Sequence, residues 1–188
     1  MEETREDNGQ PSPHGLIRDR WRQITVFLVG AAVVALYFGG YLHIPDPLEG
    51  KLAKVFSLTS LDGKKVSLAD HLGKDVVLLD FWAVWCPSCR MSIPNLAGIA
   101  EEFGPRGLAV YAVNQQDSPD AVRNFVKNRK INIAVLMDPE STAGNLYGVS
   151  GVPKIVLIDR TGIVTFVNEG YGPGTDASIR REVEKALR

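Results

Sequence analysis

The stretch FWAVWCPSCRMSIP (residues 81–94) holds both cysteines of this 188-residue chain, Cys86 and Cys89, with two residues between them. The apolar run VVLLDF (residues 76–81) leads into it and is typical of a buried central strand. Behind it, apolar side chains recur at the spacing of one helix face, as far as Phe103. The stretch therefore predicts a strand followed by a helix. It places Cys86 at the helix N-terminus, where unpaired N–H groups and the helix dipole favour a thiolate.

A Cys-x-x-Cys pair has three common uses: half of a zinc site, a passive pair of small side chains, or a dithiol that opens and closes. Structural zinc takes four ligands, and the three histidines of the chain are His14, His43 and His71. Two of them lie in or beside the N-terminal region described below, so we expect no metal site and no cofactor. The position between a strand and a helix favours the redox-active dithiol.

The net charge of −1 gives no indication of binding to nucleic acid. Residues 24–42 carry no charge, and as a helix they would extend about 28 Å, close to the thickness of a bilayer core. We predict a transmembrane signal anchor there, uncleaved because no Ala-x-Ala-like site follows. Arg18, Arg20 and Arg22 precede it, which predicts a cytoplasmic N-terminus and a domain exported across the cell inner membrane.

The remaining boundaries follow from composition. Residues 1–23 form a polar cytoplasmic tail that we expect to be disordered, residues 43–50 form a linker, and residues 51–188 have the length of one domain. Within it, Ser67 and Asp70 have the form of a capping box for a short helical turn. Periodicity and turn signals predict strands at 55–58, 76–81, 108–113, 133–137, 154–158 and 163–168, and helices at 89–103, 118–129, 141–147 and 175–187. Such alternation, ending in a hairpin, predicts an α/β fold with a mixed sheet and helices on both faces.

Four features around the cysteines resemble the thioredoxin superfamily: the lead-in Asp80-Phe81-Trp82-Ala83, Trp85 before the first cysteine, Pro94 five residues after the second, and Gly151-Val152-Pro153. The resemblance covers residues 51–188 and is nearest to the membrane-tethered TlpA, ResA and CcmG group. It implies a thioredoxin-like fold preceded by an N-terminal hairpin. It also implies a cis bond before Pro153, for which the alternative is a trans proline that ends a loop.

The resemblance implies roles for the predicted site residues. Cys86, which we expect to be partly exposed, attacks a substrate disulfide, and Cys89, more buried, resolves the mixed disulfide. Asp80, whose pKa burial would raise, accepts the proton of the second cysteine; the alternative is a solvated residue at the end of the strand. An extended substrate would pair with the Val152 backbone beside Pro153. The substrate would also pack on an apolar rim that includes Trp85 and Pro87.

The predicted function is the reduction of protein disulfides outside the cytoplasm, with a membrane electron donor that restores the dithiol. The related group acts in cytochrome c maturation, but its members there carry a glutamate three residues after the second cysteine, where this chain has Ser92. An oxidase or isomerase would differ from a reductase in its reduction potential. A peroxiredoxin-type peroxidase would need a Pro-x-x-x-Thr-x-x-Cys pattern, which is absent at Cys86. A tethered binding module with a static disulfide is the remaining alternative.

Overall fold

The computed structural model describes residues 13–38 and 45–188, and the chain divides into two units at Pro45. The first unit contains one helix, α1 (Pro13–Phe38). Residues 13–23 are therefore helical, and the prediction of disorder is wrong for this part of the tail. Proline is favoured at the first position of a helix, and extending a helix is easier than nucleating one.

No helix within the two described ranges is long and apolar enough to cross a membrane. Residues 39–42 of the predicted span lie outside the described residues, as do residues 1–12 of the predicted tail and residues 43–44 of the predicted linker. The predicted anchor is thus not confirmed by the structure.

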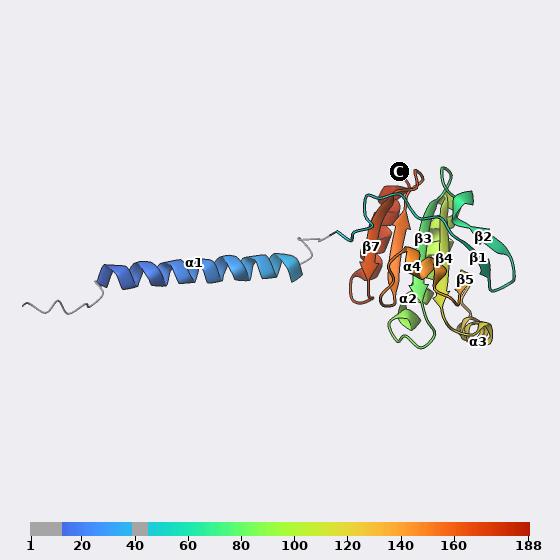
Figure 1. Cartoon of the computed structure of the whole chain (residues 1–188), viewed down its shortest axis with the longest axis horizontal. Coiled ribbons are helices and arrows are strands. Elements are labelled where there is room, and N and C mark those ends of the chain that lie inside the picture. The colour runs from blue at the N-terminus through green and yellow to red at the C-terminus, as the bar shows by residue number, and fades with distance from the viewer. Residues whose placement is uncertain (1–12, 39–44) are drawn as a thin grey trace, which may run out of the picture. The chain divides into compact units, whose positions relative to one another are not determined.

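The second unit is a seven-stranded sheet with four α-helices and two 3₁₀ turns (Figure 1). Its elements are β1 (Ser57–Ser60), β2 (Lys65–Ser67), η1 (Leu68–Asp70), β3 (Val76–Trp82), α2 (Cys89–Phe103), η2 (Gly104–Arg106), β4 (Leu108–Gln115), α3 (Pro119–Arg129), β5 (Ala134–Asp138), α4 (Thr142–Leu146), β6 (Lys154–Ile158), β7 (Val164–Glu169) and α5 (Thr175–Ala186). The strand and helix predictions from periodicity are confirmed, with shifts of a few residues at the ends. The turn at η1 forms, but Ser67 makes no side-chain capping bond, so the predicted capping box is wrong.

The strands lie in the order β2-β1-β5-β4-β3-β6-β7. In Figure 1, β7 lies toward the left of the sheet and β1 and β2 lie toward the right. Strand β3 is central: it pairs parallel with β4 and antiparallel with β6. All seven of its residues are buried, which explains its nearly continuous apolar sequence. The sheet is therefore mixed, as predicted.

Helices cover both faces of the sheet because the side chains of β3 alternate between two cores. On one face Val77, Leu79 and Phe81 pack with Tyr147, beside α4. On the other face, alternate residues of β3 pack against three helices, with contributions from Leu96 and Ile99 of α2, Val122 and Phe125 of α3, and Ile179 and Val183 of α5. Helix α2 therefore packs directly on the central strand.

Residues 46–50, which we predicted to be part of a linker, belong to the second unit and are hydrogen-bonded to its sheet. The Gly50 N–H donates to the Val164 carbonyl at 2.8 Å, and the Glu49 carboxylate accepts from the Val167 N–H at 3.0 Å. These contacts join the segment to the β6–β7 hairpin. The bond between Glu49 and Val167 joins residues 118 positions apart. Such a contact leaves no local pattern in the sequence, and composition alone therefore suggested a linker.

Candidate active site

Cys86 begins the helical hydrogen bonding of α2. The Arg90 N–H donates to the Cys86 carbonyl at 3.2 Å, and the Cys89 N–H donates to Cys86 Sγ at 3.1 Å. Cys86 therefore caps the helix with both its carbonyl and its sulfur, although regular helix is assigned from Cys89 on. An N–H group that points at the sulfur, at the positive end of a helix, stabilises negative charge there. The predicted place of Cys86 at the helix N-terminus is confirmed.

The two cysteines form a disulfide. Cys89 is fully buried and Cys86 is 3% exposed, so the prediction of a partly exposed Cys86 is wrong for this oxidised state. The carbonyl oxygen of Val152 lies 3.5 Å from Cys86 Sγ and the Ser88 hydroxyl lies 3.3 Å from it, and together they shield the sulfur. Within the described residues, no group of three or more His, Cys, Asp or Glu side chains could hold a metal ion.

The loop before β6 brings Val152 and Pro153 to the disulfide. The Val152–Pro153 peptide bond is cis, as predicted. The Pro153 carbonyl accepts from the Gly170 N–H at 2.8 Å, which fixes the loop to the residue after β7. Cys86, Val152 and Pro153 thus meet at one end of the central strands, although 66 positions separate Cys86 from Val152.

Asp80 lies on β3, on the face that α2 covers, and is fully buried. Its Oδ2 accepts from the Ser92 hydroxyl at 3.4 Å, and its Oδ1 has no hydrogen-bond partner among the described residues. Burial raises the pKa of Asp80 to about 7, which the weaker effect of the Ser92 hydroxyl opposes. The alternative of a solvated aspartate at the end of a strand is therefore wrong. An unpaired buried carboxyl group with a pKa near neutrality can accept and return a proton.

Ser92 connects Asp80 to the second cysteine. Its hydroxyl lies 3.1 Å from the Cys89 carbonyl and 3.4 Å from the Asp80 carboxylate, and its side chain is buried. In the sequence analysis, position 92 stood out only because it lacks the glutamate of the related group, and we assigned no role to the serine. Helical spacing was a usable signal: Ser92 follows Cys89 by three residues and so lies on the same face of α2.

Asp117 is a second residue that sequence reasoning missed. Its Oδ2 accepts from the Val84 N–H at 2.6 Å and from the Asn114 side-chain amide at 2.9 Å. The contact holds the loop between β3 and Cys86 against the end of β4. That loop carries Trp85, which is 70% exposed, and it continues into the exposed Pro87. The predicted apolar rim is therefore accessible to a partner.

Comparisons with known proteins agree with this geometry. A model of the AhpC/TSA family matches residues 50–167. The chain belongs to this family. It is 31% identical to the thiol-disulfide oxidoreductase ResA of Bacillus cereus over 166 residues, which are 88% of this chain and 94% of the relative. It is 37% identical to the thiol:disulfide interchange protein DsbE of Allochromatium vinosum, over 84% of this chain and 85% of that one.

Among solved structures, a candidate thiol:disulfide interchange protein DsbE from Chlorobium tepidum superposes with a TM-score of 0.70. It is 33% identical, and the match covers 77% of this chain and all of that one. The predicted thioredoxin-like fold is confirmed, as is the enzyme class, a thiol–disulfide oxidoreductase with the pair Cys86 and Cys89.

Proposed function

We propose that this protein is a membrane-anchored reductase of protein disulfides that acts outside the cytoplasm. One observation carries the proposal. The Cys86–Cys89 disulfide is in contact with the Val152 carbonyl, and the buried, poorly hydrogen-bonded Asp80 accepts a bond from Ser92, in the first turn of the same helix. A static disulfide would need neither a substrate-docking loop nor a carboxyl group with a pKa near neutrality.

The reaction starts from the reduced pair. The Cys86 thiolate attacks one sulfur of a substrate disulfide, which forms a mixed disulfide and releases the other substrate sulfur as a thiolate. The Cys89 thiol then gives its proton to the Asp80 carboxylate and attacks Cys86 Sγ. This step releases the second substrate sulfur as a thiolate and closes the Cys86–Cys89 disulfide, and the proton held by Asp80 is then free to return to a thiolate or to water. Two electrons have moved from the enzyme to the substrate, and an external dithiol donor at the membrane must return them.

Substrate docking follows from the same loop. An extended chain beside Pro153 would pair with the Val152 backbone by the geometry of strand addition. Trp85 and Pro87 would support its apolar side chains, because both are exposed next to Cys86. These contacts would hold the substrate disulfide in line with Cys86 Sγ.

Single-cysteine variants of the full chain test the proposal. We expect Cys86→Ser to abolish the reduction of insulin disulfides and Cys89→Ser to accumulate mixed disulfides that non-reducing gels detect. Wild-type activity in both variants would contradict the assignment and leave a static disulfide.

The direction of electron flow is tested by the midpoint potential of the pair. A value near −270 mV, as in thioredoxin, is expected for a reductase, whereas a value near −120 mV would favour an oxidase. Hydrogen peroxide turnover is a separate assay, prompted by the AhpC/TSA family match. We expect none, because Ala83 and Leu79 stand where the peroxidase pattern has threonine and proline.

The membrane anchor rests on the uncharged residues 24–42 and on the arginines before them. Protease added to spheroplasts is expected to digest the domain from outside. Full protection would contradict the proposed topology.

Cytochrome c maturation would supply one substrate. A haem-attachment site of the form Cys-x-x-Cys-His must be a dithiol before haem can be attached, so an oxidised peptide with this motif is a suitable probe. We expect Ser92, in place of the glutamate of that group, to make this peptide no better a substrate than insulin. A clear preference for the peptide would assign the protein to that pathway.

A further inference from the structure

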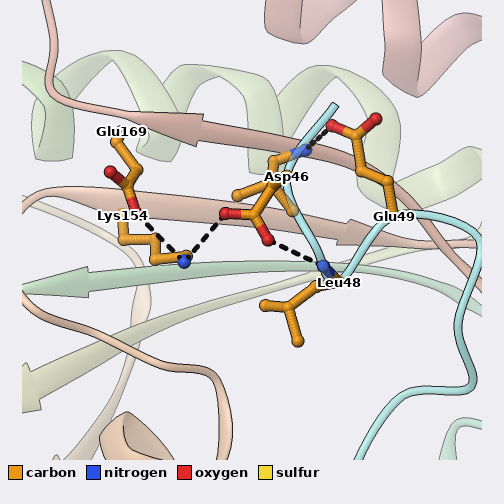
Figure 2. Close-up of polar contacts among 6 residues, drawn as sticks. Asp46, Leu48, Glu49, Lys154 and Glu169 are labelled. Carbon is orange, nitrogen blue, oxygen red and sulfur yellow. Dashed lines mark hydrogen bonds and ion pairs between the residues drawn. The ribbon is translucent and has the colours of Figure 1, made fainter. Parts of the chain in front are cut away.

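Lys154 is a buried cation that the proposed reaction does not use. It follows Pro153 directly and is 3% exposed. Its Nζ lies 3.1 Å from Asp46 Oδ2 and 3.1 Å from Glu169 Oε1. Figure 2 shows the ammonium group between the two carboxylates. A buried ammonium group is tolerated only where such partners compensate its charge.

Asp46 belongs to the lead-in segment, which we define as residues 45–50. Its Oδ1 accepts from the Leu48 N–H at 2.8 Å, and its carbonyl accepts from the Glu49 N–H at 2.9 Å, so the segment forms a tight turn. The Asp46 side chain is 16% exposed in its ion pair. Its contacts thus lie largely out of solvent, where screening by salt is weak.

Backbone pairing connects Lys154 to the catalytic end of the sheet. Lys154 pairs with Phe81 on β3 and with Glu169 on β7. The two residues before it provide the cis peptide bond and the carbonyl oxygen that lies 3.5 Å from Cys86 Sγ. A movement of the Lys154 backbone would therefore displace Val152 relative to the sulfur.

We propose that Lys154, held by Asp46, is a positioning residue that fixes the Val152–Pro153 loop for docking of protein substrates. The lead-in segment thereby becomes part of the active-site scaffold. This inference rests on the proposed disulfide reductase function and adds to it the means by which the docking loop is held in register.

The test uses the pre-reduced full chain and two oxidants in single-turnover reactions: insulin, which must dock, and hydroxyethyl disulfide, which is too small to use the loop. Lys154→Met keeps the length of the side chain and removes its charge, and Asp46→Asn removes the partner's charge. We expect each variant to oxidise about tenfold more slowly with insulin, because small displacements at the reacting centre have effects of this size or more. The rate with hydroxyethyl disulfide is expected to stay at the wild-type value.

Two controls make the result specific. Lys64→Met removes an exposed ion pair with Asp62, and we expect it to change neither rate. In the Lys154→Met background, adding Asp46→Asn is expected to have no further effect, because the two residues act as one pair. The ratio of the two rates is independent of the fraction of folded protein, so partial unfolding cannot imitate the expected result.

The outcomes separate this inference from the function on which it rests. Equal losses with both oxidants, or wild-type ratios in both variants, would overturn the positioning role while the reductase function stands. Failure of the wild-type protein to reduce insulin would overturn the function itself.

Discussion

Two buried aspartates, Asp80 and Asp138, each lie on a strand that leads to a helix, and their surroundings are opposite. Asp138 ends β5 and accepts three hydrogen bonds: from the Gln115 side chain at 3.0 Å, the Ala143 N–H at 3.3 Å and the Gly144 N–H at 2.9 Å. Asp80 accepts one weak bond at 3.4 Å. The first carboxylate accepts N–H groups of the first turn of α4, whereas the second keeps one oxygen without a hydrogen-bond partner among the described residues.

The comparison shows that a buried carboxylate can serve either structure or chemistry, depending on its hydrogen-bond donors. A carboxylate that accepts hydrogen bonds from several N–H donors has its acceptor capacity satisfied and contributes to stability. A carboxylate with almost none is destabilised when it is charged, and it gains a proton near neutral pH. Asp80 and Asp138 therefore form a natural pair of test and control positions, and substitution to asparagine should act on them in opposite ways.

The largest expected change in rate concerns Asp80. Asp80→Asn removes the proposed proton acceptor for Cys89, and we expect resolution of the mixed disulfide to become about a hundredfold slower, in the usual range for general base catalysis. The first attack by Cys86 should keep its rate. Rapid-quench measurement of mixed-disulfide formation and decay separates the two steps.

Asp138→Asn is the control for this measurement. Its hydrogen bonds lie within β4, β5 and α4, so the rate of resolution should equal that of the wild type. Equal slowing of resolution in both variants would mean that each substitution acts by destabilising the domain, and the contrast between the two sites would be lost.

At alkaline pH the two substitutions should change stability in opposite directions: Asp80→Asn should raise the free energy of unfolding, and Asp138→Asn should lower it. The folded pKa of Asp80 is raised from 3.8 to about 7, so between these values the folded state binds more protons than the unfolded state and stability falls as pH rises. Above pH 7 the full penalty is present, on the order of 4 kcal/mol. Asp80→Asn should recover most of it at pH 8 and little at pH 4, as urea unfolding at the two pH values would measure. A pH-independent difference would mean that Asp80 does not titrate in this range.

Asp138→Asn should destabilise the domain by about 3 kcal/mol, because an amide cannot accept three bonds that a carboxylate accepts and would place an N–H group against N–H donors. The exposed pair of Asp120 with Arg123 gives the matched control: Asp120→Asn should change stability by about 0.5 kcal/mol or less. Urea unfolding of the three proteins at pH 7 tests both values. If Asp138→Asn leaves the free energy of unfolding unchanged, the three bonds to this carboxylate add nothing net to stability.

Local patterns in the sequence predicted the surroundings of Asp80 but gave no role to Asp138. The apolar run around Asp80 identified a buried strand, and the helical spacing of apolar side chains from Cys89 to Phe103 identified the helix that follows. Gly151-Val152-Pro153 identified the loop with the cis peptide bond through its resemblance to a known family. Each of these signals lies within one short stretch of the chain, where strand and helix periodicity are visible.

The parts that could not be predicted depend on partners far away in the sequence. Asp117 binds the Val84 N–H across 33 positions, and Lys154 binds Asp46 across 108. The shielding of Cys86 comes from Val152, 66 positions away. Periodicity shows which face of an element is buried, but it does not show which polar group on another element will meet it there.

The smallest expected effect concerns Ser92, whose single hydroxyl hydrogen has two acceptors, Asp80 Oδ2 at 3.4 Å and the Cys89 carbonyl at 3.1 Å. The bond to Asp80 lowers its pKa against the larger effect of burial, so Ser92→Ala should raise the pKa of Asp80 further. Less carboxylate is then present at pH 7, and resolution should slow roughly fivefold, equivalent to about 1 kcal/mol for one hydrogen bond. The pH profile of that step should shift to higher pH.

Ser88→Ala is the contrasting variant, because the Ser88 hydroxyl lies 3.3 Å from Cys86 Sγ and should affect the first attack instead. If Ser92→Ala leaves the pH profile of resolution where it was, the hydroxyl hydrogen resides on the nearer acceptor, the Cys89 carbonyl. Asp80 would then have no hydrogen bond at all from the described residues. The contrast with Asp138 would become sharper, since one buried aspartate would accept no bond from the described residues while the other accepts three.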